Sequence, residues 1–202
     1  MNKKRELKEK TCKEYEVKLV KREDIKEIIE EWHYSHNING VISDYCFGLF
    51  YKDELIGGMI YGRMAMANQW KKYGENAQDV IELRRLVCVD NTLRNAESYF
   101  IGKSLKYLKK ETEIKKVVSY ADLFFGHEGI VYKASNFKNM GKTAKGRVII
   151  YQGKRYHDKT IRTKNKGELK PFAKRIKEAL KTGEAYYIQT PGKNIYVYNL
   201  KE

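Results

Sequence analysis

The order of strand-like and helix-like patterns between residues 80 and 122 is the feature that most constrains the fold of this chain. Residues 80–90 (VIELRRLVCVD) and 115–122 (KKVVSYAD) are runs typical of β-strands. Between them, residues 95–110 repeat apolar side chains at helical spacing and end in lysines, which the helix dipole favours in a last turn. A strand, a helix and a strand in this order predict a βαβ unit.

The neighbouring patterns place this unit in a mostly antiparallel sheet flanked by helices. They predict a hairpin, a helix before it, a basic helix after it and a final pair of strands. Their residues are 45–51 with 55–62, 23–36, 167–183, and 185–190 with 194–200. No linker composition or internal repeat divides the chain. We therefore expect a single domain over residues 1–202, in the α+β or mixed α/β class.

Positive charge is concentrated in the last third of the chain. The sequence carries 41 Lys and Arg against 26 Asp and Glu, a net charge of +15. Residues 138–202 hold 17 of the basic and 5 of the acidic residues, or +12, which leaves 24 and 21, or +3, for the rest. Such a field attracts a polyanion, most simply nucleic acid, and Lys154, Arg155 and Arg162 are the expected DNA contacts. A lysine-rich surface that only keeps the protein in solution is the alternative.

The sequence gives no sign of a membrane or of an oxidising compartment. No apolar run approaches the roughly 20 residues that a membrane helix needs, and the first ten residues are charged. The three cysteines, Cys12, Cys46 and Cys88, are odd in number and do not have metal-ligand spacing. We therefore expect reduced thiols, no membrane partner and a cytoplasmic protein.

Reactive side chains gather in the stretch SYADLFFGHEGIVYKASNF, residues 119–137. Asp122 ends a strand pattern, so we expect it at the strand end and outside the core, either as a proton acceptor or as a turn residue. His127 lies in a loop between two glycines and suits a base, a metal ligand or a phosphate contact. Tyr132 follows on a short helix, where a core aromatic is the plain interpretation.

Two histidines end the first helix pattern. His33 and His36 are three residues apart, a spacing that puts both on one side of a helix end and permits a metal. Trp32 belongs to the core face by periodicity, so His33 alternatively only flanks the core. A set of His33, Asp122 and His127 has the two imidazoles and one carboxylate that non-haem iron favours. Iron or another divalent metal is therefore a candidate cofactor.

Charged residues interrupt the strand pattern of residues 80–90. Because side chains alternate along a strand, Glu82 and Arg84 share a face, opposite to Arg85. A buried charge is costly unless it is paired. One interpretation is a surface pair of Glu82 and Arg84 that stabilises little. The other is that an arginine contacts a cofactor or a DNA phosphate while Glu82 faces the reaction centre.

These motifs, in their order, resemble the GNAT acyltransferase fold. The resemblance lies in IELRRLVCVDNTLRNAESYFIGKSLKYLKK, KKVVSYAD and EGIVYKASNFKNMGKT. In that fold an acyl-coenzyme A pyrophosphate loop joins a strand to a helix, and the next strand diverges to admit the pantetheine arm. More narrowly, WHYSH, IELRRL, SYADLFFGHEGIVYKASNFKNMGKT and NIYVYNL resemble the Mom proteins of bacteriophages. Those GNAT-like enzymes modify adenine in phage DNA and shield it from host restriction.

The resemblance implies roles for individual residues. Tyr132 matches a tyrosine that protonates the leaving thiolate, and Asp122 would orient or deprotonate the amine of adenine. His33 and His127 complete the catalytic candidates, and Tyr34 is expected to stack on a DNA base. Acetyl-CoA or a related acyl donor is the implied cofactor, with contacts from Arg84, Arg85, Arg94, Asn95 and Ser119. The usual glycines of the pyrophosphate loop are missing, so amides of the following helix would hold the anion.

The sequence therefore predicts a phage-type enzyme that adds an acetamide-type, methylcarbamoyl-like group to the 6-amino group of adenine in DNA. That amine is conjugated into the ring, so the enzyme must orient it and remove its base from the stack. Phe124 and Phe125 are candidates for stacking on the displaced base. Two alternatives stay open: a GNAT N-acetyltransferase acting on a protein, a tRNA or a small amine, and a DNA-binding module without enzymatic activity.

Overall fold

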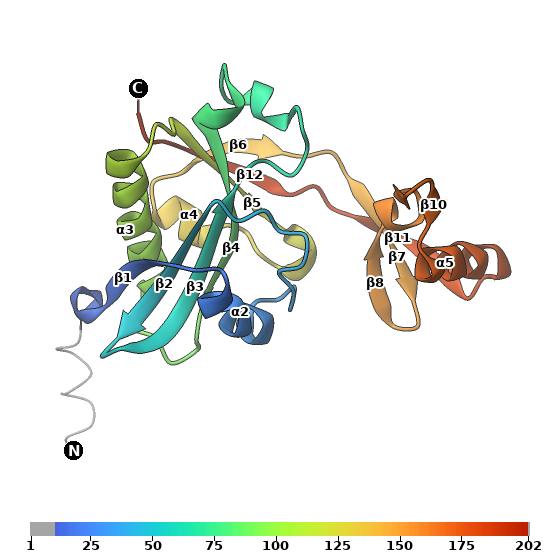
Figure 1. The fold of residues 1–202 in the computed structure, drawn as a ribbon, viewed down its shortest axis with the longest axis horizontal. Helices are drawn as coiled ribbons and strands as arrows, with labels where there is room; N and C mark the ends of the chain where they lie inside the picture. The colour runs from blue at the N-terminus through green and yellow to red at the C-terminus, as the bar shows by residue number, and fades with distance from the viewer. Residues whose placement is uncertain (1–10, 202) are drawn as a thin grey trace. The chain divides into compact units, whose positions relative to one another are not determined.

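The computed structural model describes residues 11–201 and groups them into two compact units (Figure 1). Among the described residues, unit 1 comprises 11–121, 127–141 and 194–201, and unit 2 comprises 122–126 and 142–193. The basic segment expected over residues 138–202 is therefore shared between the units. Its middle part forms most of unit 2, whereas its two ends contribute strands to unit 1.

A seven-stranded sheet in the order β1-β2-β3-β4-β5-β12-β6 forms the frame of unit 1. Its strands are β1 Glu16–Val20, β2 Tyr45–Tyr51, β3 Glu54–Gly62, β4 Val80–Cys88, β5 Lys116–Ala121, β6 Lys138–Lys142 and β12 Asn194–Asn199. Strands β4 and β5 pair in parallel, while β1–β2, β2–β3, β3–β4 and β5–β12 pair antiparallel. Helix α3 (Ala96–Glu111) joins β4 to β5, which confirms the predicted βαβ unit. The mixed, mostly antiparallel sheet expected from the sequence is confirmed with it.

Helices cover both faces of this sheet. Because side chains alternate along β3, Met59 and Tyr61 pack in the cluster that contains α3, whereas Ile60 packs in the cluster that contains α2 (Lys26–Trp32). Gly58 of β3 lets α2 come close, since a Cβ there would lie 3.1 Å from a methyl group of Ile28. The two apolar clusters hold the sheet between the helices (Figure 1).

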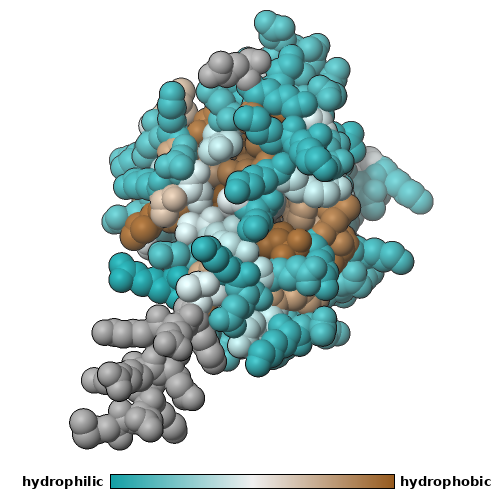
Figure 2. Space-filling view, turned by 90° about the vertical axis from the view of Figure 1, so that its left-hand side faces the viewer, coloured by the Kyte–Doolittle hydropathy of each residue, from teal (hydrophilic) through white to brown (hydrophobic). Residues whose placement is uncertain are grey.

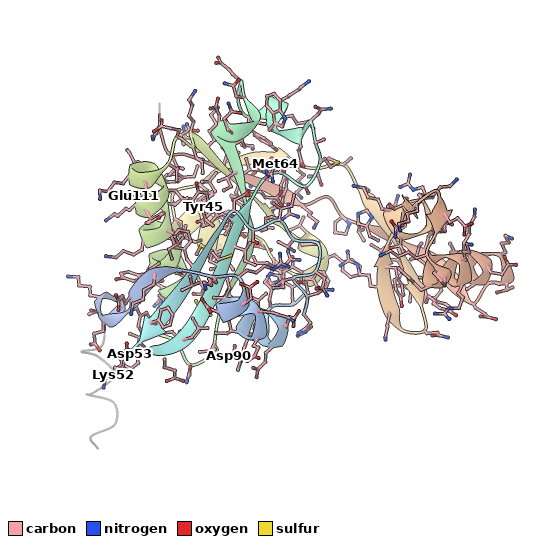
Figure 3. All side chains as sticks on the ribbon, in the orientation of Figure 1. Tyr45, Lys52, Asp53, Met64, Asp90 and Glu111 are labelled. Carbon is pink, nitrogen blue, oxygen red and sulfur yellow. The ribbon has the colours of Figure 1, made fainter. Side chains whose placement is uncertain are left out.

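The predicted hairpin of β2 and β3 is confirmed, and it closes through two residues. Lys52 (φ 48°) and Asp53 (φ 67°) both adopt the left-handed conformation that a type I′ turn requires, and Figure 3 labels them at the tip of the hairpin. Such a turn matches the twist of the flanking strands, so the register of β2 and β3 is fixed locally.

The first helix is shorter than residues 23–36 suggest. A 3₁₀ turn, η2 (Glu23–Ile25), leads into α2, which ends at Trp32. His33 already has an extended backbone, with ψ 135°. The helical placement of His33 and His36 on one face is therefore wrong. The burial of the two neighbours is also reversed: Trp32 is 41% exposed and His33 only 6%.

Unit 2 is built on a three-stranded antiparallel sheet in the order β11-β7-β8. Its elements are η5 Leu123–Phe125, β7 Gly146–Tyr151, β8 Lys154–His157, η6 Asp158–Ile161, β9 Lys164–Asn165, β10 Glu168–Leu169, α5 Pro171–Thr182 and β11 Ala185–Thr190. Helix α5 packs Ile176 and Ala179 against Ile149 and Ala185. It ends before Gly183 (φ 83°), where the sequence predicts its end.

The last two strands do not form the expected pair. Strand β11 pairs with β7 in unit 2, whereas β12 pairs with β5 in unit 1. Residues 191–193 therefore connect two sheets instead of closing a hairpin. The remaining short elements of unit 1 are η1 Cys12–Glu14, η3 Gln69–Lys72, η4 Ala77–Asp79 and α4 Ile130–Ala134.

Hydrophilic side chains cover most of the face shown in Figure 2, with smaller hydrophobic patches between them. Within residues 11–201, no helix is both long enough and apolar enough to cross a membrane. Cys12, Cys46 and Cys88 are all free thiols.

Candidate active site

Strands β4 and β5 separate partway along their length. Their parallel ladder ends at the pair Leu83 and Ser119, although β4 continues to Cys88 along β3. At this last pair the buried Ser119 hydroxyl donates to the Leu83 carbonyl over 3.1 Å. The divergence of neighbouring strands that the resemblance implies is therefore confirmed, and Ser119 marks the point where they part.

The charges of β4 are mostly buried next to this point. Glu82 and Arg84 share a face, as predicted, and their side chains are 12% and 13% exposed. Arg84 Nη1 lies 3.8 Å from Glu82 Oε2 and donates to the Arg63 carbonyl over 3.0 Å. The Ala65 amide donates to Glu82 Oε2 over 3.2 Å. This is not the surface pair of the plain interpretation, because both charges are held in place by backbone groups.

Arg85 ties the loop after α2 to β4. Its Nε and Nη2 donate to the Asn37 carbonyl over 3.3 and 3.2 Å, and its Nη1 donates to the Arg84 carbonyl over 2.7 Å. Burial lowers the pKa of the Arg85 guanidinium. Several of its donors are thus used on backbone carbonyls of the loop and of β4, and its predicted contact with a cofactor stays a prediction.

Three rings of unit 1 come together, those of His33, Tyr34 and His127. The Tyr34 ring lies 4.2 Å from the His33 ring and 4.8 Å from the His127 ring, measured between centroids. His33 follows α2, whereas His127 precedes α4, so the fold joins two distant motifs. The contacts with both imidazoles restrict the ring surface that Tyr34 offers to a DNA base.

The hydrogen bonds of His33 define its tautomer. The Ser35 amide, which can only donate, points to Nδ1 over 3.1 Å, and the Ser35 hydroxyl lies 2.8 Å from the same atom. Burial, followed by the charges of Arg85 and His127, lowers the pKa of His33 from 6.5 to about 3. The ring is therefore neutral at physiological pH and carries its proton on Nε2. It offers a hydrogen-bond donor and not a free basic nitrogen.

Tyr132 packs as a core aromatic residue, and its proton-donating role stays a prediction. Its ring packs 5.6 Å from Phe137 and 5.3 Å from Tyr196, which is an aromatic core contact. Burial raises the pKa of its hydroxyl to about 12, and the nearby Glu82 carboxylate acts in the same direction, while hydrogen bonding with Ser119 offsets part of the rise. The phenol therefore stays protonated near neutral pH and is suited to donate a proton.

The loop before α4 needs its second glycine. Gly129 has φ 81°, and a Cβ there would lie 2.3 Å from Cε2 of Tyr196. The Tyr196 hydroxyl donates to the Glu128 carbonyl over 2.6 Å. The glycine, the tyrosine and the carbonyl together fix the start of α4 and so the place of Tyr132.

Asp122 follows the last residue of β5, as predicted, and belongs to unit 2. Contrary to the expectation, it is buried, with 4% exposure. The reason is that both oxygens are in use: the Phe124 amide donates to Oδ1 over 3.1 Å, and Lys193 Nζ lies 3.0 Å from Oδ2. These contacts are those of a turn residue with an ion pair. Its predicted proton-accepting role stays a prediction.

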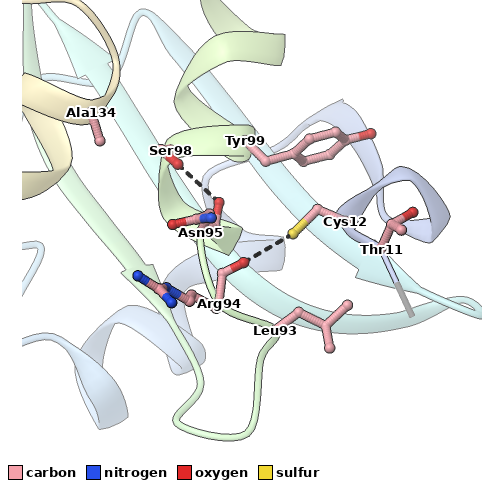
Figure 4. Close-up of a pocket in the computed structure, with 8 residues that line it drawn as sticks. All are labelled: Thr11, Cys12, Leu93, Arg94, Asn95, Ser98, Tyr99 and Ala134. Carbon is pink, nitrogen blue, oxygen red and sulfur yellow. Dashed lines mark hydrogen bonds between the residues drawn. The ribbon is translucent and has the colours of Figure 1, made fainter. Parts of the chain in front are cut away.

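The start of α3 borders a pocket of about 560 Å³ (Figure 4). Arg94, Asn95 and Ser98, together with Cys12 and Tyr99, contribute to its lining. Asn95 takes φ 70° and ψ 14°, a left-handed conformation that asparagine tolerates, so the chain makes this turn without the missing glycines. Within residues 11–201 the amides of Glu97 and Ser98 have no acceptor. The pocket can therefore hold an anion at the helix start.

The sequence did not indicate a hydroxyl network around Tyr120, the residue after Ser119. Gln69 Nε2 donates to the Tyr120 hydroxyl over 2.6 Å, and the Tyr73 hydroxyl lies 3.2 Å from it. Burial raises the pKa of Tyr120, with further contributions from Tyr73 and Glu82. Its partners come from an irregular segment without periodicity, so no local pattern could have identified them.

The structure does not decide the predicted metal set. Among residues 11–201 no three His, Cys, Asp or Glu side chains form a group able to hold a metal ion. One ring nitrogen of His33 is taken by Ser35. His33 and His127 belong to unit 1 and Asp122 to unit 2, so the set of these three residues stays a prediction, and we derive no reaction step from it.

The predicted DNA contacts other than Tyr34 all lie in unit 2. The Arg155 guanidinium lies 4.4 Å from the centroid of Phe124 and 4.8 Å from that of Phe125. Arg162 Nη2 donates to Asp158 over 2.6 Å, and Lys154 is exposed. The two phenylalanines are therefore partly covered by an arginine.

The chain is similar to one known protein family over most of its length. Residues 14–202 match the model of the Mom protein family. The methylcarbamoylase mom of Escherichia phage Mu is 29% identical over 144 residues, which are 69% of this chain and 58% of that protein. The chain thus matches less than two thirds of the length of this relative.

Solved acetyltransferases share the fold. A probable acetyltransferase from Staphylococcus epidermidis and an N-acetyltransferase from Staphylococcus aureus each have a TM-score of 0.52 at 13% identity, covering 93% of this chain and 99% of theirs. An aminoglycoside acetyltransferase in complex with coenzyme A has a TM-score of 0.50 at 12% identity, covering 64% of this chain and 87% of its own. Since the family model matches residues 14–202, nearly the whole chain, the chain belongs to the Mom protein family.

Proposed function

We propose that this protein is a DNA modification enzyme that transfers an acetamide-type, methylcarbamoyl-like group to the 6-amino group of adenine and so protects phage DNA from restriction. The observation that carries the proposal is the family match over residues 14–202, which includes every candidate of the active site. The name of the phage Mu relative, a methylcarbamoylase, supports the kind of group transferred.

An acyl-CoA-type donor fits two features of unit 1. The pocket at the start of α3 offers Arg94 and the free amides of Glu97 and Ser98 to a pyrophosphate. The part of β4 beyond Leu83, which has no partner strand on the β5 side among the described residues, offers backbone groups to an extended arm. A coenzyme A complex of an acetyltransferase with this fold supports the assignment.

The chemistry assigned to the side chains follows from their protonation. The protonated phenol of Tyr132 supplies a proton to the leaving thiolate, and the Nε2–H of neutral His33 donates a hydrogen bond at the site. Asp122 is the proposed acceptor of the proton that the amine loses. Acetyl transfer from a simple thioester would give only an N-acetylated amine, so a methylcarbamoyl-like product requires a donor whose transferred group carries one more nitrogen.

An N-acetyltransferase acting on another amine is the second candidate, favoured by the likeness to solved acetyltransferases. The two functions differ in what happens to DNA. Plasmid DNA from cells that produce the protein should resist restriction enzymes whose sites contain adenine, and it should be cut normally by enzymes whose sites contain only G and C. DNA from cells with Tyr132→Phe is the matched control. Normal cutting at adenine-containing sites in the wild type would favour the second candidate.

A further inference from the structure

Unit 2 contains a polar pocket whose lining includes none of the residues assigned to the reaction. It measures about 630 Å³ and is lined by Lys145, Gly146, Arg147, His157, Asp158, Arg162, Tyr187 and Gln189. We propose that this pocket binds one backbone phosphate of double-stranded DNA, with Arg147 and Arg162 as its donors and Asp158 as the residue that positions them. The inference rests on the proposed function, since it names the contact by which unit 2 holds the DNA substrate.

Asp158 is the centre of the pocket. It is buried, with 7% exposure, and its Oδ2 accepts from Arg162 Nη2 over 2.6 Å. Its Oδ1 lies 3.5 Å from Arg147 Nε, and among the described residues this atom accepts no hydrogen bond. A buried carboxylate with incomplete hydrogen bonding is costly, so its place between two arginines requires a reason beyond stability.

The two arginines are anchored at Asp158 but remain accessible. Their side chains are 56% and 65% exposed. Each guanidinium has five N–H donors in a planar fork, and Asp158 uses only a fraction of them. The Arg147 guanidinium also lies 4.4 Å from the centroid of the Tyr187 ring, which fixes its plane. Preoriented forks with free donors match the oxygens of a phosphate.

His157 adds a neutral donor to the same pocket. Its Nδ1 accepts from the Lys159 amide over 3.0 Å, so the neutral ring has its proton on Nε2. Burial, and then the charge of Lys159, lowers the pKa of His157. The imidazole therefore contributes a hydrogen bond but no charge at neutral pH.

The charge of the surroundings indicates a polyanion. The pocket itself has three cations, Lys145, Arg147 and Arg162, against the one carboxylate, or +2. Over residues 122–126 and 142–193, unit 2 has 15 Lys and Arg and 5 Asp and Glu, or +10. A duplex of DNA presents phosphates to such a field along its whole length, whereas a nucleotide cofactor presents only a few.

The test uses substitutions for which two explanations, a diffuse positive field and oriented arginines, predict opposite changes in DNA affinity. Asp158→Asn adds one positive charge, so a diffuse field predicts tighter binding, while the proposal predicts weaker binding because the arginines lose their orientation. Glu178→Gln, on α5, changes the charge equally outside the pocket. Affinity for a short fluorescent DNA duplex is measured by anisotropy over a range of salt concentrations, with full-length protein.

We expect Asp158→Asn to lose about tenfold in affinity and Glu178→Gln to gain or stay unchanged. The double variant Arg147→Lys with Arg162→Lys keeps every charge and a cation against Asp158. This double variant should also lose about tenfold in DNA affinity. The slope of log K against log salt should fall by about 0.9 in magnitude, which corresponds to the loss of one phosphate contact. Arg175→Lys with Lys177→Arg, on α5, is its matched control and should bind like the wild type.

Tighter binding by Asp158→Asn, or wild-type binding by the arginine-to-lysine pair, would overturn the inference. A loss of coenzyme A affinity in these variants without a loss of DNA affinity would overturn it as well, because the phosphate would then belong to a cofactor. If Asp158→Asn lowers the unfolding temperature, the lysine pair decides the outcome. Failure of the proposed function is distinguishable, since it would show as normal restriction of DNA with wild-type protein.

Discussion

The neutral state of His33 leads to a quantitative prediction about pH. The pKa of His33 is lowered from 6.5 to about 3 in the folded protein, and its side chain is 6% exposed. Between these two values the unfolded chain binds a proton that the folded protein does not bind. The contribution to stability is therefore fully present above about pH 6.5 and is lost as the pH falls towards about 3.

The size of the effect follows from the shift. One pKa unit corresponds to about 1.4 kcal/mol, so lowering the pH from about 7 to about 5 should reduce the free energy of unfolding by about 2 kcal/mol through His33 alone. His33→Gln does not titrate, and its amide oxygen can still accept from Ser35. The wild type should therefore lose about 2 kcal/mol more than His33→Gln over this range.

Two measurements check this prediction. Denaturant unfolding at the two pH values gives the change in the free energy of unfolding for each protein. The ring contact with Tyr34 that His33→Gln loses is lost at both pH values, so it cancels when the two changes are compared. Nitrogen NMR of the wild-type histidines reports the tautomer, for which we expect a protonated Nε2 and an unprotonated Nδ1 that persist at about pH 5. An identical pH dependence of the two proteins, or a His33 resonance that titrates near its ordinary value, would refute the reasoning.

Three further predictions concern the loop from β5 to α4 and the helix α4 itself. Tyr132→Phe should lower the modified fraction of adenine about a hundredfold or more, with an unchanged unfolding midpoint, because it removes only the proton donor; full activity would return Tyr132 to a purely structural role. Asp122→Asn should keep the turn, since asparagine caps similarly, yet lower the rate by roughly 10²–10⁴ if the carboxylate accepts the proton; a wild-type modified fraction would remove it from the reaction. Gly129→Ala should lower the free energy of unfolding by about 1–3 kcal/mol more than Gly126→Ala does, as measured by denaturant unfolding. Both glycines have positive φ, but only a Cβ at Gly129 would clash with Tyr196. Equal losses in the two variants would contradict the clash.

Local patterns were sufficient for the elements that bury a regular apolar face. The βαβ unit and the hairpin of β2 and β3 have strong periodicity and clear turn residues, and both are confirmed. The stretch EEWHYSH, residues 30–36, spans the end of the first helix and contains neither glycine nor proline, so nothing in it marks the helix end at Trp32. The Pro-Gly pair near residue 191 looks like a hairpin turn, but which strands pair with β11 and β12 depends on contacts distant in sequence.

The residues of the candidate site also divide into those that local patterns indicated and those that depend on contacts distant in sequence. The residue types on β4 and after β5 indicated where chemistry would lie, and the family resemblance placed Tyr132. The tautomer of His33 depends on the amide of Ser35, and the ion pair of Asp122 depends on Lys193, which is 71 positions further along the chain. No sequence pattern singled out Asp158, because its role depends on its contacts with two arginines on different elements, Arg147 and Arg162. Such relations become visible only in three dimensions.

The most direct test of the account is mass spectrometry of nucleosides from the DNA of cells that produce the protein. We expect a new deoxyadenosine derivative whose added mass stays with the base on fragmentation and corresponds to an acetamide-type group, and we expect its loss with Tyr132→Phe at matched protein level. Unmodified deoxyadenosine in the presence of folded wild-type protein, or the same derivative at wild-type level with Tyr132→Phe, would contradict the account.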